Sequence, residues 1–317
     1  MSIDNLKLID LFAGTGAFSL AFEKNSKCEC VFANDMIECS KKIYTLNNPN
    51  SIFTLKDLHE INVNDIPSHD ILCGGFPCQP FSIAGNKKGF DDNRSNVFWK
   101  IIEILETHKP EIIILENVKN LKSHDKGNTF NIIENNLGKL GYYIKTAILD
   151  TNKITNIPQH RERIYIVGFL NKEKYDEFNF NFPKKTQYKI SDMLEKNVDN
   201  KYYYSDRFKV FEEIEENITK NISENVLYQY RRYYVRENKS NCCPTLTANM
   251  GGGGHNVPLL KDDKGIRKLT PRECFNLQGF PLDYKLPDIS DTSLYKLAGN
   301  AVSVPVVDLI VEKLNNI

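Results

Sequence analysis

The length, composition and charge of the chain exclude several classes of protein. Its 317 residues can bury a large core, and this length suits one large domain or one domain with a smaller inserted lobe. No apolar run is long enough to span a bilayer and no signal peptide is recognisable, so we expect a soluble, cytoplasmic protein without a membrane partner. The formal net charge is zero, which excludes a strongly basic nucleic-acid-binding domain and confines any nucleic-acid contact to local patches.

The eight cysteines predict neither a disulfide framework nor a zinc site. In a chain of this size without a signal peptide, cysteines are expected to stay reduced. Cys28 and Cys30 are one residue apart and Cys242 is followed directly by another cysteine, but no second pair or histidine cluster completes a metal-binding pattern. We therefore expect no metal, and we expect every cysteine except Cys78 to be a buried or surface thiol without a chemical role.

A strand, a tight turn and a helix open the chain. The stretch 7–12 is a short apolar run, 13–16 is rich in glycine, and 17–24 has the spacing of a helix. Further buried strands are predicted at 30–33, 70–73, 112–115, 143–149 and 163–169. Helices are predicted between them at 36–46, 97–107 and 129–140. Because parallel neighbours need crossover connections, this alternation predicts an α/β fold with a doubly wound, mostly parallel sheet.

From about Pro183 onward the texture of the sequence changes. Lys, Glu, Asn and Tyr dominate, the periodicity weakens, and Gly251 begins a run of four glycines. We predict three parts: a catalytic domain (1–188 and 299–317), a smaller lobe (189–270) and a connecting hinge (271–298). The amphipathic stretch 303–314 has the pattern of a helix that packs back on the first sheet.

The first motif is Asp10-Leu-Phe-Ala-Gly-Thr-Gly16, at the predicted strand-to-helix turn. Glycines there let the backbone turn sharply and approach a ligand, and an acidic residue after the next strand, here Asp35, can bind ribose hydroxyls. Ser19 stands where a dinucleotide-binding fingerprint has its third glycine. A nucleoside cofactor without a pyrophosphate, such as S-adenosylmethionine, therefore fits as well as a nicotinamide dinucleotide or better. A purely structural glycine turn is the alternative.

The second motif places Cys78 after a buried strand and a glycine pair. Ligand crevices of parallel sheets lie at the carboxyl ends of the strands, so a cysteine there can act on a bound substrate. The polar stretch that follows contains two glycines, Gly85 and Gly89, which can act as hinges, and we interpret it as a mobile lid. Its candidate phosphate contacts are Lys87, Lys88 and Arg94.

Two further motifs supply acidic and basic side chains. Glu116 follows directly on the apolar run 112–115, so its carboxyl group is expected to be partly desolvated and to suit a proton donor. A helix N-cap or a loop carboxylate is the alternative. Arg161 and Arg163 alternate on a predicted strand and are expected to project from one face toward an anionic or carbonyl-rich ligand. Otherwise they are edge-strand charges that oppose aggregation.

A local basic patch is predicted in the second half of the chain. Over 228–236, Arg231, Arg232 and Arg236 are interleaved with tyrosines that can pack on sugars or bases. Arginine can donate two hydrogen bonds to one guanine edge, so these three residues are candidate readers of a base sequence. A solvated, aromatic-rich strand is the alternative for this stretch.

Taken in order, the motifs resemble those of the bacterial DNA (cytosine-5) methyltransferases, the modification enzymes of restriction systems. The resemblance runs from residue 7 almost to the end of the chain. Its segments are Asp-Leu-Phe-Ala-Gly-Thr-Gly (10–16), Gly-Phe-Pro-Cys-Gln-Pro-Phe-Ser (75–82), Glu-Asn-Val (116–118), Gln-His-Arg-Glu-Arg (159–163), Arg-Lys-Leu-Thr-Pro-Arg-Glu-Cys-Phe-Asn-Leu-Gln-Gly-Phe-Pro (267–281) and Gly-Asn-Ala-Val (299–302). A single segment can arise by chance, whereas all of them in the family's order are specific.

The resemblance implies a Rossmann-like methyltransferase that uses S-adenosylmethionine. Such an enzyme flips a cytosine out of duplex DNA and methylates its carbon 5 through a covalent adduct, here with Cys78. Glu116 is implied to contact the cytosine ring, and Arg161 and Arg163 to line its pocket. The residues implied to surround the cofactor are Phe12, Gly14, Gly16, Asp35, Met36, Asp57, Leu58, Gly75, Pro77 and Asn300. Met36 is a departure, since this position is often aromatic in the family.

The resemblance also implies partners. Double-stranded DNA is the implied substrate, and 189–270 corresponds to the family's target-recognition domain, whose Thr-Leu-containing segment we identify at 243–251. The candidate DNA contacts are Gln79, Ser82, Lys87, Arg94, Arg231, Arg232, Arg236, Thr245 and Leu246. We expect a monomer in a bacterial cytoplasm, associated with the nucleoid and paired functionally with a cognate restriction endonuclease.

Four alternatives compete with this interpretation. A nicotinamide dehydrogenase shares the glycine turn but leaves the segments of Cys78 and Glu116 unexplained. An adenine amino-methyltransferase is expected to have an Asp/Asn-Pro-Pro-aromatic segment, where this chain has Phe-Pro-Cys-Gln. The tRNA-methylating branch of the same family is marked by a Cys-Phe-Thr segment before the late motif block, whereas Cys274-Phe-Asn lies inside that block here. A non-catalytic DNA-binding regulator would not need Cys78 and Glu116.

Overall fold

The chain divides into two compact units. The computed structural model describes residues 3–77, 96–206, 208, 210–231, 234–252 and 257–317. The first unit contains Met1–Leu149, Glu162–Phe182 and Val307–Ile317, and the second contains Asp150–Arg161 and Pro183–Val306. The chain therefore enters the second unit twice. The boundaries predicted at 188, 270 and 298 concern function and stay a prediction.

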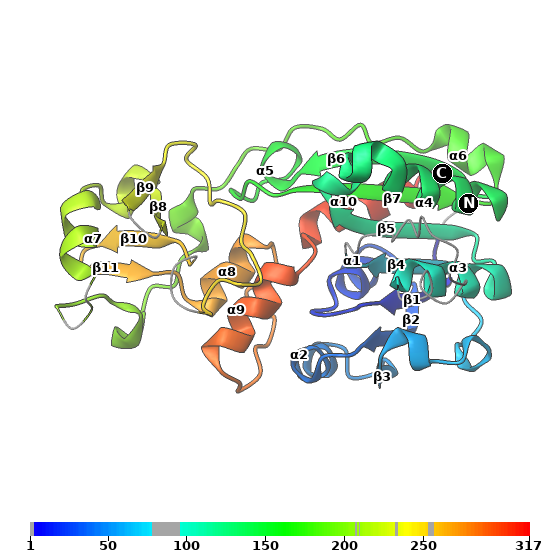
Figure 1. Ribbon diagram of the computed structural model, residues 1–317, viewed down its shortest axis with the longest axis horizontal. Helices are drawn as coiled ribbons and strands as arrows, with labels where there is room; N and C mark the ends of the chain where they lie inside the picture. Colours follow the sequence, from blue (N-terminus) through cyan, green and yellow to red (C-terminus); the bar gives the residue numbers. More distant parts are fainter. Residues whose placement is uncertain (1–2, 78–95, 207, 209, 232–233, 253–256) are drawn as a thin grey trace, which may run out of the picture. The chain divides into compact units, whose positions relative to one another are not determined.

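A seven-stranded sheet forms the centre of the first unit (Figure 1). Its strands, in the order of the sheet, are β3 (Phe53–Leu55), β2 (Glu29–Asp35), β1 (Lys7–Leu11), β4 (Ile71–Gly75), β5 (Ile112–Val118), β7 (Glu162–Phe169) and β6 (Tyr143–Asp150). The pairs β1–β2, β2–β3, β1–β4 and β4–β5 are parallel, whereas β7 runs antiparallel to β5. The predicted α/β fold with a mostly parallel sheet is confirmed.

Helices pack with the sheet to form the core of this unit. They are α1 (Ala17–Asn25), α2 (Glu38–Asn47), α3 (Val97–His108), α4 (Asn128–Lys139), α6 (Lys172–Glu177) and α10 (Val304–Leu314), whose first three residues belong to the second unit. The first four residues of β5 are apolar and at most 1% exposed, as expected of a central strand covered on both faces. Ile101 of α3 and Ile133 of α4 belong to the same hydrophobic core as Ile113 of β5. Asp308 of α10 accepts hydrogen bonds from Lys24 (2.6 Å) and Asn25 (2.7 Å), which ties the end of the chain to α1.

A four-stranded antiparallel sheet forms the centre of the second unit. Its strands, in the order of the sheet, are β11 (Gly265–Lys268), β10 (Leu259–Asp262), β8 (Leu227–Arg231) and β9 (Tyr234–Asn238). Its helices are α5 (Thr151–Ile154), α7 (Phe211–Asn217), α8 (Pro271–Leu277) and α9 (Asp291–Asn300). Tyr228 and Tyr230 of β8 pack with Ile214 of α7 and with Leu259 and Ile266 of the neighbouring strands. Of the stretch 228–236, for which a strand was the alternative interpretation, residues 228–231 lie in β8 and 234–236 in β9.

One segment among the described residues is long and apolar enough to cross a membrane by composition alone. It is Asp291–Leu314, the stretch that contains α9 and α10, and 78% of its most apolar window is buried inside the protein. Residues 301–303 between the two helices are not helical. Such burial is typical of core helices, which pass the same test of length and hydropathy.

Candidate active site

The glycine turn after β1 depends on positive backbone φ angles. Phe12, Gly14 and Gly16 have φ values of 56°, 52° and 70°, in the left-handed region that glycine adopts without strain. Gly16 precedes α1, and a Cβ atom on it would lie 3.0 Å from the ring of Tyr44. The turn therefore needs glycine at Gly16 for two reasons, its backbone conformation and the close approach of α2.

The carboxylate of Asp35 holds this turn from the end of β2. Its Oδ2 accepts a hydrogen bond from the backbone N–H of Gly14 at 3.0 Å, and its Oδ1 accepts one from Ile37 at 2.9 Å. Burial raises the pKa of Asp35 above its usual range. The side chain of the neighbouring Met36 is 65% exposed. The ribose-binding role implied for Asp35 stays a prediction, but the structure shows that this carboxylate shapes the turn.

A buried polar cluster is centred on Asp10 of β1, a residue for which no individual role was predicted. Its Oδ2 accepts hydrogen bonds from the hydroxyl (2.7 Å) and the backbone N–H (3.3 Å) of Ser19. The hydroxyls of Ser19 and Tyr44 lie 2.8 Å apart. Burial raises the pKa of Asp10 to about 7. Ser19, which replaces the third glycine of a dinucleotide fingerprint, thus partners a buried carboxyl group.

The remaining cofactor candidates lie in several places. Asp57 caps the 3₁₀ turn Leu58–Glu60 by accepting a hydrogen bond from the N–H of His59 at 3.0 Å, and Leu58 is buried. Gly75 ends β4, and Pro77 is exposed. Asn300 is exposed at the end of α9 and belongs to the second unit, whereas the other nine candidates belong to the first. Their cofactor-binding roles stay a prediction.

Glu116 and Arg163 form an ion pair near the end of β5. The Arg163 Nε atom lies 3.1 Å from Glu116 Oε1, and Glu116 is 7% exposed, which agrees with the shielding expected from the apolar run before it. In the sheet, Glu116 pairs with Gly75, the last residue of β4. Asn117 donates a hydrogen bond to the carbonyl of Phe76 at 2.9 Å, so the chain is held beside Glu116 as it leaves β4.

Arg161 has a different environment from Arg163. Strand β7 begins at Glu162, so the alternation of side chains on which a shared face was predicted does not extend to Arg161. Its guanidinium donates hydrogen bonds to the carbonyls of Leu246 (3.0 Å), Gly299 (3.2 Å) and Ala301 (2.7 Å), and the residue is 2% exposed. Arg161 therefore joins three segments of the second unit through their backbones.

The predicted DNA contacts differ in exposure. Leu246 is 1% exposed and its carbonyl accepts a hydrogen bond from Arg161, and its role in DNA binding stays a prediction. Thr245 is half-buried and donates a hydrogen bond to the carbonyl of His160 at 2.6 Å. Arg231 and Arg236 are exposed on the hairpin β8–β9. The predicted site residues outside the described ranges are Cys78, Gln79, Ser82, Lys87, Arg94 and Arg232.

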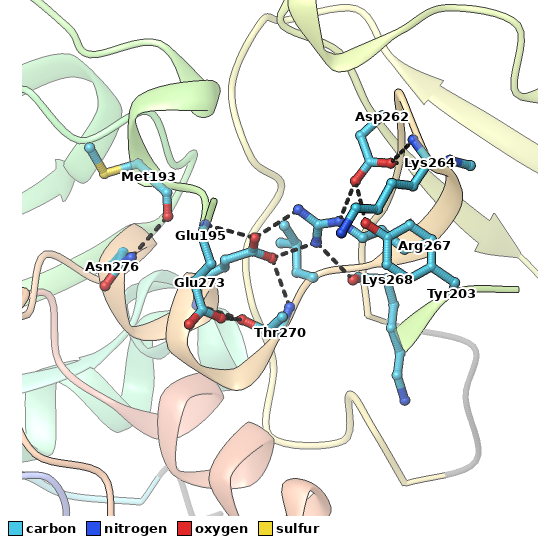
Figure 2. Close-up of polar contacts among 12 residues, drawn as sticks. Met193, Glu195, Tyr203, Asp262, Lys264, Arg267, Lys268, Thr270, Glu273 and Asn276 are labelled. Carbon is cyan, nitrogen blue, oxygen red and sulfur yellow. Dashed lines mark hydrogen bonds and ion pairs between the residues drawn. The ribbon is translucent and has the colours of Figure 1, made fainter. Parts of the chain in front are cut away.

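A buried ionic network in the second unit was missed by the sequence analysis (Figure 2). The guanidinium of Arg267 on β11 makes two hydrogen bonds of 2.8 Å to Glu273 of α8 and one of 2.8 Å to Asp262 of β10. Glu273 also accepts a hydrogen bond from the N–H of Thr270 at 2.8 Å, and Tyr203 donates one to Asp262 at 2.9 Å. The network ties the β10–β11 hairpin to α8. A readable signal was the capping box formed by Thr270 and Glu273, with proline at the first helical position.

Comparison with known proteins identifies the family. The family model described as C-5 cytosine-specific DNA methylase matches residues 6–316. The chain belongs to this family. It is a DNA (cytosine-5)-methyltransferase, and the resemblance seen in the motifs is confirmed. The dehydrogenase and adenine-methylating alternatives are thereby excluded.

Curated relatives align with this methyltransferase over nearly its whole length. Type II methyltransferase M.Bsp6I of Bacillus sp. (strain RFL6) is 48% identical over 313 residues, which cover 98% of each chain. M.HaeII of Haemophilus aegyptius is 40% identical over 98% of this chain and 93% of its own. M.HhaI of Haemophilus parahaemolyticus is 35% identical over 97% and 94%.

Solved structures share the fold of the methyltransferase. A variant of Spodoptera frugiperda DNMT2 superposes with a TM-score of 0.77 at 20% identity, covering 98% of this chain and 99% of its own. Dnmt2 methyltransferase of S. pombe superposes with a TM-score of 0.74 at 23% identity, covering 98% of both chains. At these identities the likeness concerns the fold alone. In the ranges that the structure describes, no group of three or more His, Cys, Asp or Glu side chains is placed to hold a metal ion.

Proposed function

We propose that the protein flips one cytosine out of a short duplex site and methylates carbon 5 through a covalent adduct with Cys78. The observation that carries this proposal is the ion pair of the buried Glu116 with the half-buried Arg163, beside the carboxyl end of β4. Cys78 follows Gly75, the last residue of β4, by three residues in the sequence. A nucleophile and a buried carboxyl group are the two functions that this chemistry requires.

Cys78, Glu116 and Arg163 have separate roles in the proposed reaction. The thiolate of Cys78 forms a bond to carbon 6 of the flipped cytosine, and the electron pair of the ring double bond becomes available at carbon 5. Glu116 acts as a carboxylic acid oriented by Arg163 and donates a hydrogen bond to nitrogen 3, which stabilises the charge developing on the ring. When bound, S-adenosylmethionine would supply the electrophilic methyl group for carbon 5, and S-adenosylhomocysteine would be the leaving group. Loss of the carbon 5 proton to a base and departure of the thiolate restore the ring and regenerate Cys78.

The glycine turn fits a nucleoside-bearing methyl donor. Asp35 presents its carboxylate beside Gly14, and the exposed Met36 follows at the position where an adenine ring can pack. We propose that the other cofactor candidates of the first unit line the same site. They are Phe12, Gly16, Asp57, Leu58, Gly75 and Pro77.

The biological role that we propose is protection of DNA in a restriction–modification system. Three curated relatives of nearly equal length are type II methyltransferases. A cognate endonuclease would then cleave the same site when it is unmethylated, and a monomeric enzyme in the cytoplasm suffices. Because carbon 6 cannot be reached inside a stacked duplex, the site must be bound with its cytosine extruded, at a cost of a few kcal/mol.

A duplex that contains 5-fluorocytosine at the target position tests the nucleophile. Fluorine cannot leave as a proton, so wild-type protein with S-adenosylmethionine should form an adduct that survives denaturation. Cys78→Ala should form none and should still bind the cofactor. Cys39→Ala, which changes a half-buried thiol on α2, is the matched control and should behave as wild type. An adduct with Cys78→Ala would refute the assignment.

A further inference from the structure

On one face of the hairpin β8–β9, positions 229, 231, 234 and 236 carry polar or positively charged side chains, whereas Leu227 on the same face is buried. In the antiparallel register, Gln229 lies opposite Arg236 and Arg231 lies opposite Tyr234. Directly opposed residues project from the same face, and so do residues two apart on one strand, so these four side chains share a face. Arg231, Tyr234 and Arg236 are exposed there.

The opposite face of the same hairpin is engaged with the rest of the second unit. Tyr228, Tyr230 and Val235 pack into the small hydrophobic core. Glu237, which lies opposite Tyr228, is ion-paired with Lys220 at 2.8 Å. The two faces therefore have different roles. One anchors the hairpin, and the other presents two arginines and has no acidic side chain at positions 229, 231, 234 and 236.

Gln229 is arranged to hold an arginine rather than to reach a ligand itself. Its side-chain carbonyl Oε1 accepts a hydrogen bond from an Nη2 atom of Arg231 at 3.0 Å. Gln229 is 9% exposed, whereas Arg231 is exposed. Fixing a long side chain in advance lowers the entropy lost when it binds. The bond also sets the direction of the guanidinium plane, on which bidentate recognition depends.

Duplex DNA is the partner that this face fits. A two-stranded ribbon has the width of the major groove, and arginine is the side chain that pairs with the O6 and N7 atoms of guanine. The protein as a whole carries no net charge, so a face with two arginines is a local match to a polyanion. We propose that Arg231 and Arg236 enter the major groove from this face and that Gln229 is a positioning residue that fixes Arg231 for reading one guanine. This inference rests on the proposed function.

The test compares variants on a set of duplexes in which each position of the methylated site is replaced in turn. Arg231→Ala should relax one position, with discrimination there falling by about 5- to 150-fold. Gln229→Met, which keeps the length of the side chain and removes the acceptor, should relax the same position to a smaller extent. The double variant should discriminate no worse than Arg231→Ala alone, because residues that act as a pair are not additive.

Glu237→Gln is the matched control on the opposite face and should leave the methylation pattern unchanged. Gln229→Glu keeps an acceptor for Arg231 and should keep the wild-type pattern, although its charge should weaken binding at all sites. Relaxation of a different position by Gln229→Met would overturn the inference, and so would an unchanged pattern with Arg231→Ala. If wild type instead transfers no methyl group to duplex cytosine, the proposed function fails and not this inference alone.

Discussion

The two units hold their buried charges in different ways. In the first unit, the buried Glu116 and the half-buried Arg163 form an ion pair beside the end of β4, where the chain that leads to Cys78 begins. In the second unit, Arg267 is enclosed by the carboxylates of Asp262 and Glu273. We expect the first pair to serve chemistry and the second network to fix a scaffold. The same contrast decides what each substitution should do.

The largest expected effect is on the rate of the first unit. Glu116→Gln keeps the shape of the side chain but removes its acid, so single-turnover methyl transfer should fall by about 10²- to 10⁴-fold. The fold and cofactor binding should be retained. Glu111→Gln is the control, because Glu111 pairs with Lys174 on the surface of the same unit. A near-normal rate with Glu116→Gln would make this carboxylate structural and remove half of the contrast.

The next effect is on the stability of the second unit. Arg267→Met leaves the fully buried Glu273 without its cation and should cost about 3–5 kcal/mol in the free energy of unfolding, measured by urea denaturation. Adding Glu273→Gln should restore part of this loss, because the uncompensated charge disappears. Lys201→Met removes a partly exposed pair with Asp291 and should cost about 0–1 kcal/mol. If Arg267→Met and Lys201→Met lowered the free energy of unfolding equally, this would contradict a scaffold role for the network.

The third expected effect concerns how the stability of the first unit depends on pH. Burial raises the pKa of Asp10 from 3.8 to about 7, so the folded protein holds this proton more tightly than the unfolded chain. The stability that this proton provides is complete below about pH 4, falls as the pH rises to about 7 and is absent above it. Asp10→Asn should remove this dependence, with a difference from wild type that changes by up to about 4 kcal/mol between pH 4 and pH 8.

The measurement is the difference between Asp10→Asn and wild type in urea unfolding at several pH values. Other titrating groups cancel in this difference. Asp65→Asn, which changes an exposed carboxylate of the same unit, should show a flat difference over the whole range. A flat difference for Asp10→Asn as well would mean that Asp10 is ionised in the folded protein.

The smallest expected effect is a gain. Met36 is 65% exposed beside Asp35, so Met36→Trp should add stacking on the adenine ring of the cofactor and tighten its binding by about 2- to 10-fold. Titration calorimetry with S-adenosylmethionine measures this change. Leu46→Trp adds the same side chain at another exposed position, 40% exposed on α2, and should change nothing. Equal effects of the two variants would argue against the assigned adenine position.

The first unit was predictable from sequence because its strands are rich in apolar residues and alternate with helical patterns. The predicted strands at 7–12, 112–115 and 163–169 correspond to β1, β5 and β7 with small differences at their ends. Strand β5 extends through Glu116 to Val118 because the antiparallel β7 continues to pair with it, which a local pattern does not encode. The three-residue β3 was missed, since it forms only by pairing with β2.

The second unit and its contacts were harder to predict from sequence, because they too depend on pairing between distant residues. Strands β10 and β11 have only four residues each, and the turn signal between them, 263–265, was not recognised. The partners of Arg161 are carbonyls 85 to 140 residues away, so no spacing in the sequence reveals them. Whether a polar side chain such as that of Arg161 faces a ligand or a backbone depends on such long-range contacts.

The double entry of the chain into the second unit limits how recognition can be exchanged between related enzymes. Gln159, in the short segment Asp150–Arg161, donates hydrogen bonds to Leu277 (2.6 Å) and Gln278 (3.1 Å) and accepts one from Leu246. A chimaera that transplants only 183–306 from a relative would keep the host's version of this segment inside a foreign unit. A graft that replaces both segments together preserves these contacts, so a new DNA specificity should survive transfer in two-segment chimaeras.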